Sequence, residues 1–252
     1  MVESVKRVFK KKIWSGDYDS WGQLIDQCSG YSHEVILQKQ IESTQAVLSG
    51  RAVFERDTCL FYEELFNFPV IASLLRASEE GRLSVIDFGG AFGSTYHQNK
   101  SAFGDFSVKW GIVEQLHFVK IGRERFSSDV ISFHEDLGSA IRAVQPQVLF
   151  SSSTFQYLEK PGEWIEKVIS CGVPYILLDR ISFNAAPRQR LTKQTVPESI
   201  YRAQYPCWFF SEAEFLRFFE LQYDLIWQFH SLDQADIDSY FKGFFFRRKD
   251  LG

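Results

Sequence analysis

Cysteine is scarce in this chain of 252 residues, and long apolar runs are missing altogether. The four cysteines form no C-x-x-C pair, which excludes the common zinc-ligand spacing and argues against a disulfide framework. No run of about 18 apolar residues is available to span a membrane, and no apolar signal-peptide core follows the basic start. We therefore expect a cytoplasmic protein with reduced thiols and without a metal site.

An excess of positive charge is also missing, because 28 Lys and Arg residues oppose 32 Asp and Glu residues. Nucleic acids are usually bound through a broad basic surface, so the formal net charge of −4 argues against a nucleic-acid partner. The N-terminal segment is the exception, with basic residues and helically spaced apolar residues between positions 5 and 13. Two interpretations stay open for residues 5–13: contact with an anionic membrane surface, or a solvated first helix.

Methionine is almost absent, and aromatic residues take its place. The chain has one Met but 25 Phe, 10 Tyr and 6 Trp, so aromatic rings must fill much of the core or line a pocket. Hydrophobic residues make up 45% of the chain, a fraction that excludes an intrinsically disordered protein. The length is sufficient for one large domain or two small ones.

The hydrophobic periodicity changes near Gly81. Helical patterns dominate residues 1–80, including residues 34–48, residues 61–66 and a segment after Pro69, and predict an N-terminal helical cap. After Gly81, short apolar runs alternate with helix-compatible segments, which is typical of a parallel sheet with helices on both faces. These runs are residues 83–88, 108–114, 129–133, 147–150 and 175–179.

Residues 81–252 are expected to form the second unit, after the N-terminal helical cap, and the final third of the chain predicts a different arrangement from the alternating strands and helices before it. An aromatic-rich helix over residues 212–221 precedes two strands, residues 223–229 and 241–247, whose short connection indicates an antiparallel pair at the end of the sheet. An insertion at about residues 181–210 is rich in aromatic and basic side chains. We expect it to be a lid that binds a sugar carrying phosphate or carboxylate, or else the interface of a homodimer.

The clearest motif is the segment V-I-D-F-G-G-A-F-G-S at residues 85–94. An apolar strand ends near Asp87, and the glycines after it allow a ligand to approach the backbone at the carboxyl end of the strand. The spacing of Gly89, Gly90 and Gly93 differs from the G-x-G-x-x-G of dinucleotide-binding proteins, which disfavours a nicotinamide-dependent oxidoreductase. An acidic residue just before such a loop suits S-adenosylmethionine, whose ammonium group needs a carboxylate partner.

Three further strand ends carry polar residues that suit the rest of this cofactor. Glu114 follows the second strand, where it would accept hydrogen bonds from both ribose hydroxyls or else be an exposed strand-end glutamate. His134 and Glu135 follow the third strand, where the adenine would lie. Ser151 and Ser152 follow the fourth strand near the expected sulfonium, although such serines are often only turn or cap residues.

Several sequence blocks occur together along residues 13–230. They are Trp14, Gly16-Asp-Tyr18, Trp21, Glu55-Arg-Asp57, Asp87-Phe-Gly-Gly with Gly93, Trp110, Val113-Glu-Gln115, Phe155-Gln-Tyr-Leu158, Leu178-Asp-Arg180 and Tyr205-Pro-Cys-Trp208. In combination they resemble a family of bacterial S-adenosylmethionine-dependent methyltransferases, whose genes often lie beside O-antigen or capsule genes.

This resemblance implies a fold, a cofactor site and a reaction. The fold would be the α/β, Rossmann-like class I methyltransferase fold, whose seven-stranded sheet is parallel except for one antiparallel terminal strand. Ala91 departs from the general methyltransferase loop, which has a glycine there. The reaction would be O-methylation of a sugar or glycan intermediate of surface-polysaccharide synthesis; the alternative is a non-catalytic scaffold with the same fold. The residues expected to contact the cofactor are Asp87, Gly89, Gly90, Gly93 and Glu114.

Transfer of a methyl group to a sugar hydroxyl would need a general base. The candidates near the strand ends are Asp179, Arg180, Tyr157 and His97. We expect Asp179 to ionise readily beside Arg180 and to accept the proton, while Arg180 holds an anionic sugar. The alternative for these two residues is an internal ion pair. His97 is either a second base or a polar residue on a helix face.

Overall fold

The computed structural model describes residues 12–28, 34–198, 200–201 and 203–251. Most of the basic segment for which membrane contact is a possibility, residues 5–11, lies outside the described residues, so that interpretation stays a prediction. Within the described ranges, no helix is long and apolar enough to cross a membrane.

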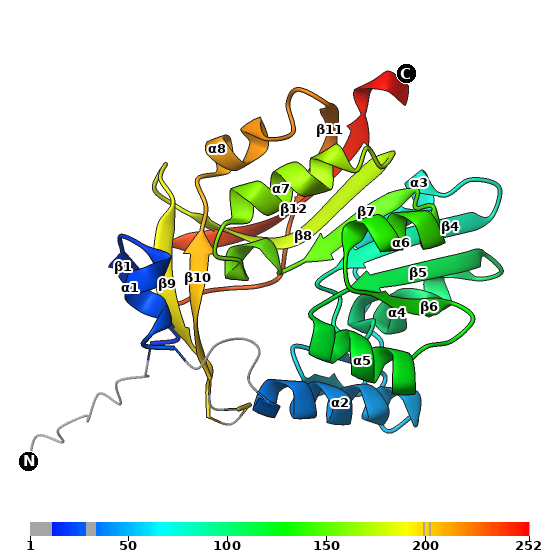
Figure 1. The fold of residues 1–252 in the computed structure, drawn as a ribbon, viewed down its shortest axis with the longest axis horizontal. Helices are drawn as coiled ribbons and strands as arrows, with labels where there is room; N and C mark the ends of the chain where they lie inside the picture. The colour runs from blue at the N-terminus through cyan, green and yellow to red at the C-terminus, as the bar shows by residue number, and fades with distance from the viewer. Residues whose placement is uncertain (1–11, 29–33, 199, 202, 252) are drawn as a thin grey trace, which may run out of the picture.

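Seven strands form the central sheet, in the order β11-β12-β8-β7-β4-β5-β6 (Figure 1). The last strand in the chain, β12 (Ser239–Arg248), runs antiparallel between β8 and β11 (Tyr223–His230). This order confirms the prediction of a mostly parallel sheet that ends in an antiparallel pairing. The parallel neighbours are β4 (Arg82–Phe88), β5 (Ser107–Val113), β6 (Ile131–His134), β7 (Val148–Ser152) and β8 (Tyr175–Asn184).

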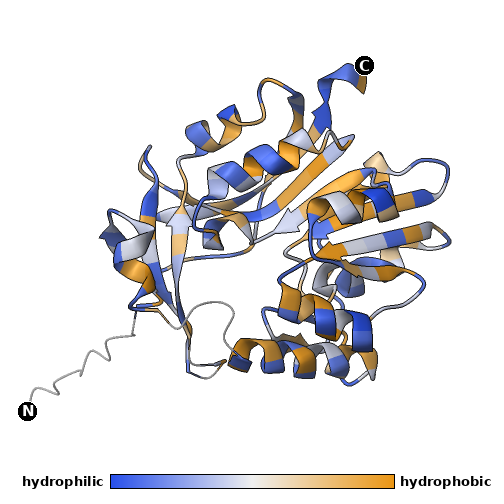
Figure 2. Ribbon diagram, viewed as in Figure 1, coloured by the Kyte–Doolittle hydropathy of each residue, from blue (hydrophilic) through white to orange (hydrophobic). Residues whose placement is uncertain are grey.

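Helices cover both faces of the parallel part of the sheet (Figure 1), where strand side chains alternate between the faces and both sets are apolar and buried, whereas the edge strand β11 is mostly exposed. Figure 2 shows the hydropathy of each residue along the ribbon. In β4, Ile86 packs in one core cluster and its neighbour Val85 in the other. The first cluster includes residues of α6 (Leu137–Val144), α7 (Pro161–Ser170) and α8 (Glu212–Arg217), which ends earlier than predicted. The second includes residues of α2 (Glu34–Leu48), α3 (Phe68–Ala77) and α5 (Leu116–Arg125). The remaining short helices are α4 (Ser94–Asn99), η1 (Lys100–Phe103), η2 (Phe155–Tyr157) and η3 (Lys249–Leu251).

A second, three-stranded sheet has the order β1-β9-β10 (Figure 1). It consists of β1 (Trp14–Tyr18), β9 (Arg190–Thr195) and β10 (Gln204–Phe209), with antiparallel pairing throughout. The insertion predicted after the fifth parallel strand thus forms a hairpin that pairs with an N-terminal strand. Segments far apart in the sequence therefore lie side by side in this small sheet.

The N-terminal 80 residues combine helices with strands. Helices α1 (Trp21–Ile25), α2 and α3 are present, but the helix predicted over residues 61–66 is wrong. Phe61 instead ends a hairpin formed by β2 (Phe54–Arg56) and β3 (Cys59–Phe61). Its ring stacks on that of the opposite residue, Phe54, with 4.4 Å between the ring centroids. Cross-strand aromatic pairing of this kind stabilises a hairpin over a helix.

The β2–β3 hairpin turns through Asp57 and Thr58, whose φ angles are 51° and 67°. Positive φ at both central residues defines a type I′ turn, which matches the twist of two-residue hairpins. Aspartate tolerates this left-handed conformation, whereas a β-branched threonine does not. The hairpin therefore carries backbone strain at Thr58.

We expect Thr58→Gly to raise the free energy of unfolding by about 1 kcal/mol, because glycine adopts positive φ without the clash of a branched Cβ. Chemical denaturation followed by circular dichroism measures this change. Thr195→Gly in strand β9 is the control, and there the same substitution should destabilise the protein. Equal destabilisation by both substitutions would show that Thr58 is not strained.

Candidate functional site

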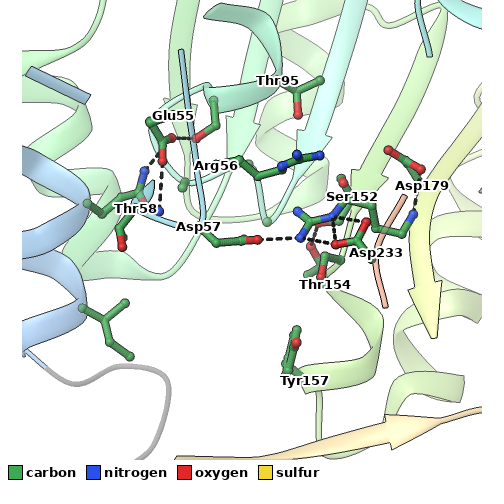
Figure 3. A pocket seen from close by; sticks show the side chains of 18 of the residues that line it. Glu55, Arg56, Asp57, Thr58, Thr95, Ser152, Thr154, Tyr157, Asp179 and Asp233 are labelled. Carbon is green, nitrogen blue, oxygen red and sulfur yellow. Dashed lines mark hydrogen bonds and ion pairs between the residues drawn. The ribbon is translucent and has the colours of Figure 1, made fainter. Parts of the chain in front are cut away.

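A cavity of about 530 Å³ lies at the carboxyl ends of β4, β5 and β7 and beside the middle of β8. Open α/β sheets bind their ligands at this edge. The β2–β3 hairpin, the β9–β10 region and the loop between β11 and β12 contribute the other walls. Figure 3 shows the side chains that meet there.

The glycine loop after β4 approaches its neighbours too closely for larger residues at two positions. A Cβ at Gly89, which has a φ of 77°, would lie 2.3 Å from Oγ1 of Thr154. A Cβ at Gly90 would lie 2.4 Å from the carboxyl carbon of Asp87. Ala91 adopts a φ of 49°, so the residue that replaces the expected glycine keeps a left-handed conformation. Gly89 and Gly90 also line the cavity, so the loop presents backbone without side chains to it at these two positions.

Asp87 lies beneath this loop, where its side chain is 1% exposed. One carboxylate oxygen accepts a hydrogen bond from Nε1 of Trp110 at 3.0 Å. Burial raises the pKa of Asp87 to about 7; the Trp110 hydrogen bond opposes this shift and the nearby charge of Glu114 adds to it. Asp87 is therefore partly protonated at neutral pH and would ionise more readily beside a cation.

Two acidic residues follow β5 and β6 on the same wall. Glu114 accepts backbone hydrogen bonds from Ala91 at 3.3 Å and from Gln115 at 2.8 Å, and burial raises its pKa. Glu135 also lines the cavity and forms an ion pair with Arg123 at 2.9 Å. Both carboxylates thus reach the edge at which the sequence places a nucleoside.

Four predicted site residues, all in the described part of the chain, lie off the cavity wall. Gly93 precedes α4 with a φ of 90°, and Ser151 donates a hydrogen bond from Oγ to the carbonyl of Phe88 at 2.9 Å. His134 bonds to the hydroxyl of Ser132. Burial and then Lys100 lower the pKa of His97 to about 4, so this imidazole is neutral at pH 7. These residues shape the loops around the cavity without facing it.

Asp179 lines the cavity beside the middle of β8 and is 2% exposed. Its carboxylate accepts three hydrogen bonds of 2.8 Å, from the backbone of Arg180, from Oγ of Ser231 and from Nδ2 of Asn67. Burial nevertheless raises the pKa of Asp179, against the opposing effects of the Ser231 hydrogen bond and of the charge of Arg180, and its role as the base stays a prediction. The alternative interpretation, an internal ion pair between Asp179 and the Arg180 side chain, is not what forms. Arg180 has a φ of 58°, which interrupts the regular strand, and its guanidinium pairs with Asp57 and Asp233 instead.

The guanidinium of Arg180 instead bridges Asp57 and Asp233, both of which are labelled in Figure 3. Its Nε lies 3.0 Å from both carboxylate oxygens of Asp233, and its Nη2 lies 2.5 Å from Oδ2 of Asp57. Burial alone would raise the pKa of Asp57, but Arg180 and then Arg56 hold it below the ordinary value. The positive charge of Arg180 is thus already balanced by two carboxylates, an arrangement that disfavours its expected role as a clamp for an anionic sugar.

Glu55 connects the hairpin to two helices. It is 3% exposed and accepts hydrogen bonds from Nε2 of Gln40 at 2.8 Å, from the backbone of Thr58 at 3.1 Å and from the hydroxyl of Ser94. Burial raises the pKa of Glu55. The contact with Ser94 joins the hairpin directly to the helix that follows the glycine loop.

Backbone strain is concentrated at this cavity. Seven described residues other than glycine have positive φ, and five of them line the cavity wall. Such conformations are costly and persist where the surrounding structure enforces them, often at functional sites. The five are Asp57, Thr58, Ala91, Ser153 and Arg180.

The insertion contributes aromatic side chains to the cavity, but none of its described basic residues lines the cavity wall. Tyr157 donates a hydrogen bond to Oε1 of Gln194 at 2.9 Å, and its ring meets that of Tyr205 edge to face at 5.3 Å. Arg188 forms an ion pair with Asp17 at 2.5 Å, away from the cavity. Arg188, which was expected to help hold an anionic sugar, is thus paired with a carboxylate of the N-terminal strand β1.

Several site residues were missed by sequence reasoning. The sequence shows Asp233 only as part of an acidic connection between strands and Gln194 only as a polar residue of the insertion, and Asn67 and Ser231 are not among the predicted site residues. Each lies far along the chain from its partner, and no local pattern signals the contact. Asn67 alone has a local signature, since an asparagine before Phe68-Pro69 is typical of a helix N-cap, and its side chain accepts from Val70.

Comparison with solved structures identifies the fold. The glycopeptide N-methyltransferase MtfA, in complex with S-adenosyl-L-methionine, matches with a TM-score of 0.50 over 71% of this chain and 92% of its own, at 13% identity. LepI in complex with S-adenosylmethionine also gives 0.50, over 72% of this chain and 47% of LepI, at 10% identity.

A Burkholderia thailandensis 1,6-didemethyltoxoflavin-N1-methyltransferase with bound S-adenosylhomocysteine matches over 93% of this chain and 92% of its own, with a TM-score of 0.46 and 12% identity. No protein-family model matches the sequence, and no functionally curated protein shows significant similarity to it. The chain has the class I methyltransferase fold, as predicted.

We expect the free energy of unfolding to fall as the pH rises from about 5 to about 8. Between the ordinary pKa of an aspartate and about 7, folded Asp87 keeps a proton that the unfolded chain has released. The folded state therefore binds more protons, and stability decreases with pH by as much as about 1.4 kcal/mol per pH unit.

Asp87→Asn should reduce this slope, because the amide keeps an acceptor for Trp110 but does not titrate. Urea denaturation of both proteins at a series of pH values measures the slopes. Glu55, Glu114 and Asp179 contribute in the same direction and remain in the variant, so the difference between the two proteins is the relevant quantity. Parallel profiles would contradict a raised pKa at Asp87.

Proposed function

We propose that this chain is an S-adenosylmethionine-dependent methyltransferase whose cofactor lies across the glycine loop. The observation that carries the proposal is the bare backbone at Gly89 and Gly90 between the carboxylates of Asp87 and Glu114. In this arrangement Asp87 would receive the ammonium group of the cofactor, and Glu114 would accept the ribose hydroxyls. Two proteins of the same fold, MtfA and LepI, were solved with S-adenosylmethionine, which supports this assignment.

The carboxylate of the cofactor needs a cationic partner, and Arg56 suits it. Arg56 lines the cavity from the β2–β3 hairpin and lies over the ring of Phe61, 5.4 Å from its centroid. Within the described residues, no carboxylate lies at ion-pair distance from Arg56, whereas Arg180 has two. We therefore propose that Arg56 binds the carboxylate of the cofactor. Arg180 would instead hold Asp57 and Asp233 in place around the part of the cavity that receives the methyl acceptor.

Calorimetry with S-adenosylmethionine, S-adenosylhomocysteine and NAD⁺ tests the cofactor. We expect micromolar binding of the first two and none of NAD⁺. Glu114→Gln should weaken binding by about 10- to 100-fold, the range for losing hydrogen bonds to a charged group. Glu124→Gln, on the exposed surface of α5, is the matched control and should bind like the wild type. No binding of either adenosyl compound would refute the proposal.

When bound, S-adenosylmethionine supplies an electrophilic methyl group. The acceptor needs a nucleophilic oxygen or nitrogen, and we propose that Asp179 takes the proton that this atom loses. A buried carboxylate with a raised pKa is a stronger base than an exposed one, and Asp179 faces the cavity from β8. Tyr157 lies on the opposite wall and would position the acceptor (Figure 3).

The acceptor class that we propose is a sugar or glycan. The rings of Tyr157, Tyr201 and Tyr205 line the acceptor side, and aromatic rings pack well on the apolar faces of sugars. Its origin in surface-polysaccharide synthesis rests on the sequence resemblance alone. The cytoplasmic location, dimer formation through residues 181–210 and membrane contact through residues 5–13 likewise stay predictions.

Asp179→Asn should lower kcat by about 10²- to 10⁴-fold, the usual contribution of a general base, with little change in cofactor affinity. Transfer of labelled methyl groups to a panel of free sugars, nucleotide sugars and lipid-linked glycans measures turnover. Asp105→Asn, at an exposed loop position, serves as the control. Turnover by Asp179→Asn at the wild-type rate would assign the base elsewhere, and absence of transfer to all acceptors by the wild type would favour the non-catalytic scaffold.

A further inference from the structure

The cavity wall carries a strong excess of acidic residues. Its only described basic residues are Arg56 and Arg180, and neither lysine nor histidine occurs among the described residues that line it. If Arg56 holds the carboxylate of the cofactor, no unpaired cation among these residues remains for an acceptor. The acidic ones are Glu55, Asp57, Asp87, Glu114, Glu135, Asp179 and Asp233.

The acceptor side keeps a net negative charge even at its arginine. The bridge of Asp57, Arg180 and Asp233 combines one guanidinium with two carboxylates. Arg180 is only 13% exposed, and two of its nitrogens are occupied by these carboxylates. The low pKa of Asp57 keeps this group ionised at neutral pH. The bridge therefore presents about one unit of unbalanced negative charge to the cavity.

Aromatic rings lie close to this bridge. Tyr157 faces the same space as Asp57 and Asp233, and its ring contacts that of Tyr205 (Figure 3). Burial raises the pKa of Tyr201, and the charge of Asp57 adds to this shift, so the phenol lies within the field of that carboxylate. Carboxylates together with the faces of aromatic rings are the usual recognition chemistry for ammonium groups.

We propose that the methyl acceptor carries a protonated amine, which is recognised by the bridge of Asp57, Arg180 and Asp233 and by the adjacent tyrosine rings. For a glycan acceptor this means an amino sugar with its amine free, rather than a sugar phosphate or a sugar acid. The inference rests on the proposed function but concerns the recognition of charge, not the atom that is methylated.

An anionic acceptor would be repelled by the carboxylates that line the cavity. A phosphate in this cavity would face the second carboxylate of the bridge and Asp179 without an unpaired cation among the described lining residues. To take the place of a carboxylate on Nε or Nη2 of Arg180, it would have to break contacts of 2.5 to 3.0 Å, and this would leave Asp57 or Asp233 unpaired. The arrangement thus selects against anions as well as for cations.

Titration calorimetry of the full chain saturated with S-adenosylhomocysteine tests the inference. The probes are methyl β-glucosaminide, its N-acetyl derivative and glucose 1-phosphate, all at neutral pH. The free amine should bind at least about tenfold more tightly than the N-acetyl compound, and the phosphate should bind most weakly. Equal affinities, tighter binding of the phosphate, or binding of none of the three would overturn the inference.

The variant Asp57→Asn tests whether Asp57 recognises the charge of the acceptor or only maintains the shape of the cavity. Asparagine tolerates the left-handed turn at this position and keeps an oxygen that can accept the hydrogen bond from Arg180, while it removes the negative charge. We expect affinity for the amine to fall by about 10- to 100-fold and affinity for the N-acetyl compound to stay unchanged. Equal loss for both probes would mean that Asp57 only maintains the shape of the cavity, and would count against the inference. Asp224→Asn on the exposed face of β11 is the control for a change in overall charge.

Two results distinguish this inference from the proposed function. If S-adenosylhomocysteine does not bind, the methyltransferase assignment itself fails. If it binds but the three sugars are not discriminated by charge, only the amine proposal fails. Thermal unfolding of each variant, with and without S-adenosylhomocysteine, checks that the substitution leaves the fold and the cofactor site intact.

Discussion

The ion-paired guanidinium of Arg180 is the contact on which the shape of the cavity depends. It joins the β2–β3 hairpin through Asp57 and the β11–β12 loop through Asp233 to the central sheet (Figure 3). A charge with little exposure is tolerated only when it is paired, and removal of one partner is strongly destabilising. The planar, forked guanidinium can bind two carboxylates in fixed directions, which a lysine cannot do. Three segments that are distant in the chain are therefore held around one space by one side chain.

Strained loops around this space are supported by the aromatic core beneath them. The ring of Phe88, just before the glycine loop, packs against Phe155 at 5.7 Å and Trp164 at 5.3 Å. A buried ring of this size contributes about 2 to 3 kcal/mol. This packing fixes the end of β4, so the left-handed residues after it are enforced rather than merely tolerated. The abundance of phenylalanine thus has a structural role next to the site.

The sequence predicts those features whose signals are local. Alternating apolar runs identify the strands of the central sheet, and the D-F-G-G segment identifies the loop at the edge of β4, because both depend on neighbouring residues. The β2–β3 hairpin, the pairing of β1 with β9 and the partners of Arg180 depend on contacts between distant segments, which no short pattern encodes. Asp179 and Arg180 are adjacent in the sequence and both line the cavity, yet they have separate partners. Arg180 interrupts the regular strand with a φ of 58°, and its guanidinium reaches aspartates that are distant in the chain.

The acidic cavity links the stability of the protein to what it can bind. Glu55, Asp87, Glu114 and Asp179 all have raised pKa values, with burial as the leading cause, so ionisation of each opposes folding while the cavity holds no cation. A bound cation lowers these pKa values, and by linkage its affinity rises as the carboxyl groups lose their protons. An anion has the opposite effect on the same groups. Carboxyl groups whose ionisation opposes folding at neutral pH are therefore the same groups that would favour the positively charged acceptor that we propose.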